Sequence, residues 1–114
     1  MPNSVVMRIE GRDFELFKAG KKFWEIRLND DKRKGVGVGD EIVFMRRPQL
    51  EDRLPMIVEE KVPFMNVQRL LDKIPLSEIT DCPSEVEYVQ YLMTHYTPGE
   101  MVEKGLVAFK VRKA

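Results

Sequence analysis

Residues 20–27 decide how this chain folds, and they read GKKFWEIR. An apolar helical pattern that begins near Asp13 stops at Gly20, because glycine ends helices readily. A strand pattern starts at Phe23. The octet therefore predicts a junction between a helix and a strand, with Lys22 in the joint.

The strand that follows separates apolar from charged side chains. A period of two puts Trp24, Ile26 and Leu28 on one face, and Phe23, Glu25 and Arg27 on the other. The apolar face predicts core packing for Trp24. Glu25 and Arg27 are about 6–7 Å apart along their face.

Two charges on a strand of a buried sheet are costly unless they pair or meet a ligand. We therefore predict that Lys22, Glu25 and Arg27 form one mixed-charge cluster at the mouth of a cleft. The alternative is a structural ion pair on a half-exposed strand, which is the commoner case. Because exposed ion pairs contribute little, we expect replacement of Lys22 by alanine to leave stability nearly unchanged.

The rest of the chain alternates strand and helix patterns around this octet. Strands are predicted near 5–9, 41–47, 56–62 and 106–112, and residues 29–40 read as a turn-rich loop. We expect Pro55 and Pro63 to bound the third of these strands. Helices are predicted after three capping residues, which are Asn66, Ser84 and Thr97.

The apolar stripe of the helix after Ser84 is predicted to be Val86, Val89, Met93 and Tyr96. Three strands follow one another between helical segments, so a strictly alternating parallel sheet is excluded. We predict an α+β fold, a small mixed β-barrel with helices at its openings. We expect residues 1–114 to form a single domain.

Composition excludes several classes of protein. The chain has 114 residues, 43% of them hydrophobic and 33% charged, with a formal net charge of zero. Disorder and a polycationic surface are both excluded, so any nucleic-acid site must be a local patch. One cysteine and one histidine leave no disulfide framework and no His-rich metal site, and we expect no metal and no cofactor. No apolar run approaches the roughly 18 residues of a membrane helix, so we expect a cytoplasmic protein without a membrane partner.

Charge is distributed unevenly along the chain. Residues 18–34 carry seven bases and three acids, whereas residues 76–103 carry six acids and no base. Lys32, Arg33 and Lys34 are candidates for contacts with a nucleic-acid backbone, which need only charge and reach. The acidic stretch is typical of solvated helix faces. A protein-interaction module that uses these acidic helices remains a third possibility.

The octet also matches the motif Gly-x-Lys-x-x-Glu-x-Arg through Gly20, Lys22, Glu25 and Arg27. After the charged loop, residues 38–44 read VGDEIVF, a strand that starts from a Gly-Asp pair. On these residues the chain resembles a small single-domain member of the ASCH domain family. This family belongs to the PUA-like superfamily. The resemblance covers the first 45 residues well and the rest in outline. It implies a PUA-like β-barrel with helices over a cleft that the motif lines, and RNA binding as the expected role.

One branch of small ASCH proteins hydrolyses the amide of N4-acetylcytidine. The resemblance to that branch makes Lys22 the catalytic lysine, but the branch has a threonine where this sequence has Glu25. The branch also uses a downstream glutamate, and Glu78, Glu85 and Glu87 offer no confident match. Glu25 would also favour the charged form of Lys22 and make it a poorer base.

Two functions from different classes follow. In the first, the cleft binds a nucleotide or an unpaired RNA base, with Phe23 stacking and Glu25 accepting from an exocyclic amine. Lys22 and Arg27 meet phosphate or carbonyl oxygens, and Lys32, Arg33 and Lys34 follow the backbone. In the second, the protein is an amidohydrolase of acylated nucleosides, with Lys22 and Glu25 as its catalytic residues. Whether Tyr88 and Tyr91 border the cleft is left open.

Overall fold

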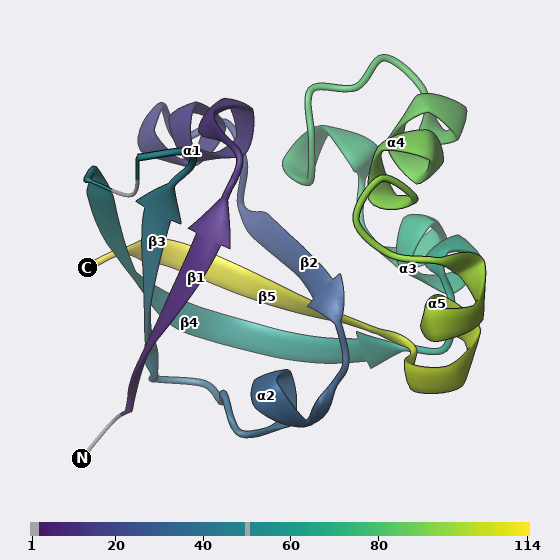
Figure 1. The fold of residues 1–114 in the computed structure, drawn as a ribbon, viewed down its shortest axis with the longest axis horizontal. Helices are drawn as coiled ribbons and strands as arrows, with labels where there is room; N and C mark the ends of the chain where they lie inside the picture. Colours follow the sequence, from purple (N-terminus) through teal and green to yellow (C-terminus); the bar gives the residue numbers. More distant parts are fainter. Residues whose placement is uncertain (1–2, 50) are drawn as a thin grey trace.

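The computed structural model describes residues 3–49 and 51–114. Its centre is a five-stranded sheet with the order β1-β3-β4-β5-β2, and the sheet curls into a half-barrel (Figure 1). The strands are β1 (Ser4–Ile9), β2 (Trp24–Leu28), β3 (Glu41–Arg46), β4 (Arg53–Phe64) and β5 (Leu106–Lys113). The pair β1–β3 is parallel and the other three pairs are antiparallel. The sheet is therefore mixed, as the sequence predicts.

Helices lie at both ends of the half-barrel and along one side of it. The helices are α1 (Gly11–Lys18), α2 (Asp31–Lys34), α3 (Val67–Lys73), α4 (Glu85–Leu92) and α5 (Pro98–Lys104), with a 3₁₀ turn at Leu76–Glu78. Helices α1 and α2 lie at opposite ends of the curl, and α3, α4 and α5 gather beside β2 (Figure 1). Asn66 caps α3 and the Thr97–Glu100 capping box starts α5, which confirms both predicted helix starts.

The alternation in β2 and β5 divides the apolar interior into two cores. One core contains Phe17, Phe44 and Phe109 inside the curl. The other contains Trp24 and Ile26, packed against α3, α4 and α5. Both strands have side chains in the interior on both faces, so the charged face of β2 is buried as well. This arrangement places Glu25 and Arg27 under the curl and not on the surface.

Two sequence expectations about the elements are wrong. Residues 31–34 form the short helix α2 inside the predicted loop, because the Asp30 side chain accepts a hydrogen bond from the Arg33 backbone N–H and caps it. Pro55 and Pro63 lie within β4 and not at its ends, and they pair with Val43 and Val107. An irregularity in pairing next to Val58 breaks the register of this long strand, which lets it bend with the curl.

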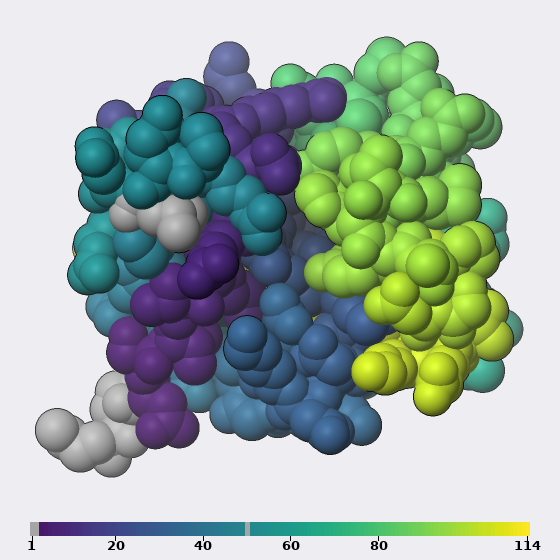
Figure 2. Space-filling model, in the orientation of Figure 1, coloured from purple at the N-terminus to yellow at the C-terminus, as the bar shows by residue number. Residues whose placement is uncertain are grey.

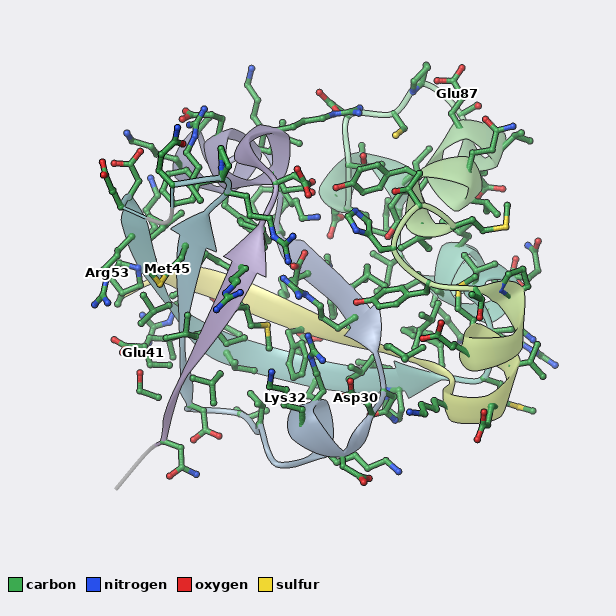
Figure 3. All side chains as sticks on the ribbon, in the orientation of Figure 1. Asp30, Lys32, Glu41, Met45, Arg53 and Glu87 are labelled. Atoms are coloured by element: carbon green, nitrogen blue, oxygen red, sulfur yellow. The ribbon has the colours of Figure 1, made fainter. Side chains whose placement is uncertain are left out.

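The buried face of α4 is also not the predicted one. Val86 and Met93 are 66% and 45% exposed, whereas Tyr88 and Leu92 are buried. Tyr88 and Leu92 are four positions apart and share one helix face, and the Tyr88 ring contributes more apolar area than a valine. The helix also ends at Leu92, so Tyr96 does not extend its face. Glu87 projects away from the sheet (Figure 3), as expected for an acidic solvated face.

Candidate functional site

A cavity of about 240 Å³ lies where α1, α4, β1 and β2 meet. Figure 2 shows the hollow between the purple N-terminal strand and the green helices of the C-terminal half. Its charged lining includes five bases, which are Arg8, Lys22, Arg27, Arg33 and Arg47. Three acids, Glu10, Asp13 and Glu25, line it as well. Tyr88, Tyr91, Tyr96 and His95 complete its polar and aromatic lining.

Lys22 lies at the bottom of this charged lining. The chain reverses at Gly20, whose φ of 72° suits glycine, and the Lys22 backbone N–H donates to the Leu16 carbonyl at 3.2 Å. The Lys22 residue is only 5% exposed. Its ammonium nitrogen is 3.4 Å from an Asp13 oxygen and 3.3 Å from a Glu25 oxygen. One buried cation therefore bridges two buried carboxylates.

Glu25 is shared between two cations. Its second oxygen is 2.8 Å from Nη2 and 2.9 Å from Nε of Arg27, a charge-assisted contact through two nitrogens. Nη2 of Arg27 also donates to the Arg8 carbonyl at 2.8 Å. The Arg27 side chain thus connects β2 to β1, the two outer strands of the half-barrel, across the cavity.

Asp13 belongs to this site, although the sequence indicated only that a helix begins near it. Helix α1 begins at Gly11, so Asp13 lies inside the helix and is 7% exposed. Tyr91 donates to its carboxylate at 2.5 Å, and Lys22 binds its other oxygen. Asp13 precedes Phe17 by four positions, and this shared helix face is the signal that would have placed it inside.

The charges of the cluster shift several pKa values. Burial raises the pKa of the Glu25 carboxyl, but the positive charges of Arg27 and Lys22 outweigh it and hold the pKa below its ordinary 4.5. Burial lowers the pKa of Arg27, yet Glu25 brings it above the usual range. The pKa of Tyr91 is raised well above 10 by burial and by its hydrogen bond to Asp13. The cluster therefore contains an ionised carboxylate and neutral tyrosines near pH 7.

The lowered pKa of Glu25 predicts loss of stability in acid. Because this pKa is lower in the folded than in the unfolded chain, the unfolded chain binds protons first as pH falls, and stability is lost progressively below about pH 4.5. Urea unfolding midpoints measured from pH 7 to pH 2 should show this decline. Glu25→Gln should have a flatter profile than the wild type. If the midpoints of Glu25→Gln and the wild type fall equally with pH, other carboxylates, such as Asp40, account for the loss of stability in acid.

The structure brings together four of the seven predicted binding residues. Lys22, Glu25, Arg27 and Arg33 line the cavity. Phe23, Lys32 and Lys34 are not among the lining residues. Phe23 precedes β2 and is 42% exposed, because its backbone bonds to Glu78 and Val111 turn it away from the site. Lys32 lies on α2 and is exposed (Figure 3).

Tyr88 and Tyr91 both line the cavity, which answers the question that the sequence left open. The lining also includes Arg8, Arg47 and His95, which the sequence did not single out as binding residues. These side chains come from β1, from the end of β3 and from the turn after α4. These three residues are distant in the sequence and meet only in the folded chain, so no local sequence pattern predicts that they share a cavity.

The burial of Lys22 overturns the expectation that its replacement leaves stability unchanged. We expect Lys22→Ala to lower the free energy of unfolding by about 1–3 kcal/mol, since two buried carboxylates lose a donor while each keeps another. Denaturant unfolding measures this loss. Lys21→Ala, an exposed neighbour, is the matched control and should change little. A Lys22→Ala midpoint equal to that of the wild type would contradict the burial.

Two other kinds of feature are absent from residues 3–49 and 51–114. No cluster of three or more His, Cys, Asp or Glu side chains that could hold a metal is present in that part of the chain. Among the same residues, no helix has the length and apolarity to cross a membrane.

Solved structures share this architecture. The crystal structure of hypothetical protein PH0355 has a TM-score of 0.88 and 26% identity, and the match covers 97% of this chain and 99% of that one. The solution NMR structure of PF0455 from Pyrococcus furiosus has a TM-score of 0.75 and 24% identity, over 99% of this chain and 97% of that one. No family model matches the sequence, and no curated protein does.

A third solved structure is named for the ASCH family, which residues 20–27 resemble. The crystal structure of a mutant ZmASCH protein from Zymomonas mobilis has a TM-score of 0.69 and 17% identity, over 99% of this chain and 71% of that one. The likeness confirms an ASCH-like, PUA-like α+β fold for this chain.

Proposed function

We propose that the cavity binds one unpaired base of an RNA or a nucleotide. The observation that carries this proposal is the cluster of buried Asp13, Lys22 and Glu25 with the nearly buried Arg27, in the wall of a cavity beside three tyrosines. Burying three charged side chains is costly, and a purely structural role needs no space beside them. A cavity lined by convergent polar groups and aromatic rings is the usual form of a small-molecule site.

The size of the cavity suits a single base or nucleoside. Its volume of about 240 Å³ lies just below the roughly 300–1,000 Å³ of pockets for drug-sized ligands. Tyr91 is half-buried and contributes an aromatic ring on which a base can stack, and the buried Tyr88 ring packs beside it with its centroid 6.5 Å away. A longer RNA would have to place one flipped-out base in the cavity and the rest outside.

The remaining hydrogen-bonding capacity suits a base edge that has an amine and a carbonyl. An ammonium has three donors, and Lys22 directs two of them to Asp13 and Glu25. The third can reach a ligand carbonyl. Carboxylate oxygens accept more than one hydrogen bond each, so Glu25 can still accept from an exocyclic amine.

The amidohydrolase is the second candidate, because Lys22 has a carboxylate on either side and lies at a cavity. Glu25 or Asp13 would activate water, and Lys22 would stabilise the oxyanion. The lowered pKa of Glu25 makes it a weak base near pH 7. The Lys22 ammonium is also held by two carboxylates and is poorly placed to act as a nucleophile. The geometry thus favours binding over turnover.

The test is a titration of the protein with cytidine, adenosine, uridine, guanosine and N4-acetylcytidine, followed by NMR of the aromatic and lysine side chains. We expect shifts of Tyr88, Tyr91 and Lys22 with a nucleoside that carries an exocyclic amine. Lys32→Ala is the control and should leave nucleoside binding unchanged. Absence of cavity shifts with all five nucleosides and with a short single-stranded RNA would overturn the proposal.

The same samples separate binder from enzyme. Chromatography after incubation with N4-acetylcytidine should show little cytidine. Robust release of cytidine that Lys22→Ala and Glu25→Gln abolish would make the protein an amidohydrolase.

A further inference from the structure

Two arginines at the mouth of the cavity have no ion-pair partner among the residues that the structure describes. The other bases of the lining are paired: Lys22 with Asp13 and Glu25, Arg27 with Glu25, and Arg33 with Asp30 at 2.7 Å. Within residues 3–49 and 51–114, no ion pair involves the side chain of Arg8 or Arg47. Both side chains are exposed at the mouth.

The backbones that carry these two arginines are held close together. Strands β1 and β3 are parallel neighbours, and Ile9 pairs with Arg46 in their register. The Arg47 backbone N–H donates to the Ile9 carbonyl at 2.9 Å, while the Arg8 carbonyl accepts from Arg27. Both arginines therefore start from the same end of the sheet, on a main chain that is already hydrogen-bonded.

Space for a ligand continues past them. A second hollow of about 540 Å³ is lined by Arg8, Glu10, Arg47 and Pro48. Arg8, Glu10 and Arg47 also line the first cavity. The two hollows are therefore adjacent, and the three shared side chains stand at the passage between them.

We infer that this passage is an anion subsite, in which Arg8 and Arg47 bind the phosphate of the nucleotide whose base occupies the cavity. Guanidinium groups match phosphate oxygens in a bidentate geometry, which makes arginine well suited to phosphate. The negative charge of Glu10 repels a phosphate dianion. Glu10 lies beside the two arginines, however, and its carboxylate can accept a hydrogen bond from a ribose hydroxyl. The inference rests on the proposed function and adds to it that the ligand is a phosphorylated nucleotide and not a free nucleoside.

This assignment moves the phosphate contact away from the basic helix α2. Lys32 and Lys34 are exposed and do not line either hollow, so they can meet only more distant phosphates of a longer strand. A mononucleotide should therefore depend on the two arginines and not on the two lysines.

The experiment compares the affinities of the four nucleosides with those of their 5′- and 3′-monophosphates by calorimetry. The proteins are the wild type, Arg8→Gln, Arg47→Gln and the double variant, with Lys32→Gln/Lys34→Gln as the matched charge control. We expect the wild type to bind one monophosphate at least about tenfold more tightly than its nucleoside, since charge-assisted hydrogen bonds are roughly twice as strong as neutral ones. Each single variant should reduce this ratio, and the double variant should bring it close to one with nucleoside affinity retained.

The outcomes distinguish the two proposals. If nucleosides bind and their monophosphates bind no better, the anion subsite is refuted and the base site stands. If the ratio survives in the double variant or disappears in the lysine control, the phosphate is bound elsewhere and the inference is likewise refuted. If nucleosides, monophosphates and a short single-stranded RNA all fail to bind, the proposed function itself fails.

Discussion

Replacement of Glu25 by alanine is expected to lower the free energy of unfolding by about 3–5 kcal/mol, the usual cost of removing one partner from a buried ion pair. Glu25 is 5% exposed and is the carboxylate shared by Lys22 and Arg27. Without it, two buried or nearly buried cations face each other across a cavity. Lys22 keeps Asp13, whereas Arg27 keeps only the Arg8 carbonyl within residues 3–49 and 51–114.

Denaturant unfolding of Glu25→Ala against Glu103→Ala measures this effect. Glu103 is an exposed acid of α5, so its replacement should leave the midpoint nearly unchanged. Glu25→Gln keeps the shape and removes the charge, and most of the loss should remain. If Glu25→Ala unfolds at the same denaturant concentration as the control, the cluster contributes nothing to stability.

Trp24→Ala should lower the free energy of unfolding by a similar amount, about 3–5 kcal/mol, because it removes a large side chain from the core. Trp24 is 7% exposed and packs in the core beside α3, α4 and α5. Its indole N–H also donates to Glu78 at 3.1 Å. The variant would leave a large void and a half-buried carboxylate without its donor.

Its neighbour Phe23 is the natural control for Trp24. Phe23 is 42% exposed, so Phe23→Ala should destabilise far less, and Trp24→Phe should restore much of what alanine loses. Thermal and urea unfolding would both report the difference. A large loss in Phe23→Ala with little in Trp24→Ala would mean that the two faces of β2 are exchanged.

The octet at 20–27 predicted the local part of this site well because its information is local. The stop at Gly20, the strand after it and the separation of Trp24 from Glu25 all follow from backbone preference and a period of two. The structure confirms these three predictions. Trp24 lies in the core beside α3, α4 and α5, and Glu25 lies on the opposite face of β2. The depth of burial was not predictable in the same way, because it depends on which segments cover the strand.

The other half of the site comes from segments distant in the sequence. Asp13 and Tyr91 are 78 positions apart, and their hydrogen bond depends on how the fold places α4 relative to α1 around the cavity. The hydrophobic stripe of α4 suggested the wrong face, so Tyr88 and Tyr91 could not be placed. Arg8 and Arg47 meet because two parallel strands pair, and parallel pairing has no short-range signal.

The hydrogen bond from Arg27 to the Arg8 carbonyl also bears on solubility. In the part of the chain that the structure describes, β1 and β2 end the sheet, and the exposed rim of such a strand is a common starting point for aggregation. Here both rims border the same charged hollow, and Arg27 already occupies a β1 carbonyl between them. An incoming strand would have to displace this guanidinium and lay its backbone among buried charges. We therefore expect the groups that we assign to ligand recognition also to hinder strand addition at this part of the sheet edge.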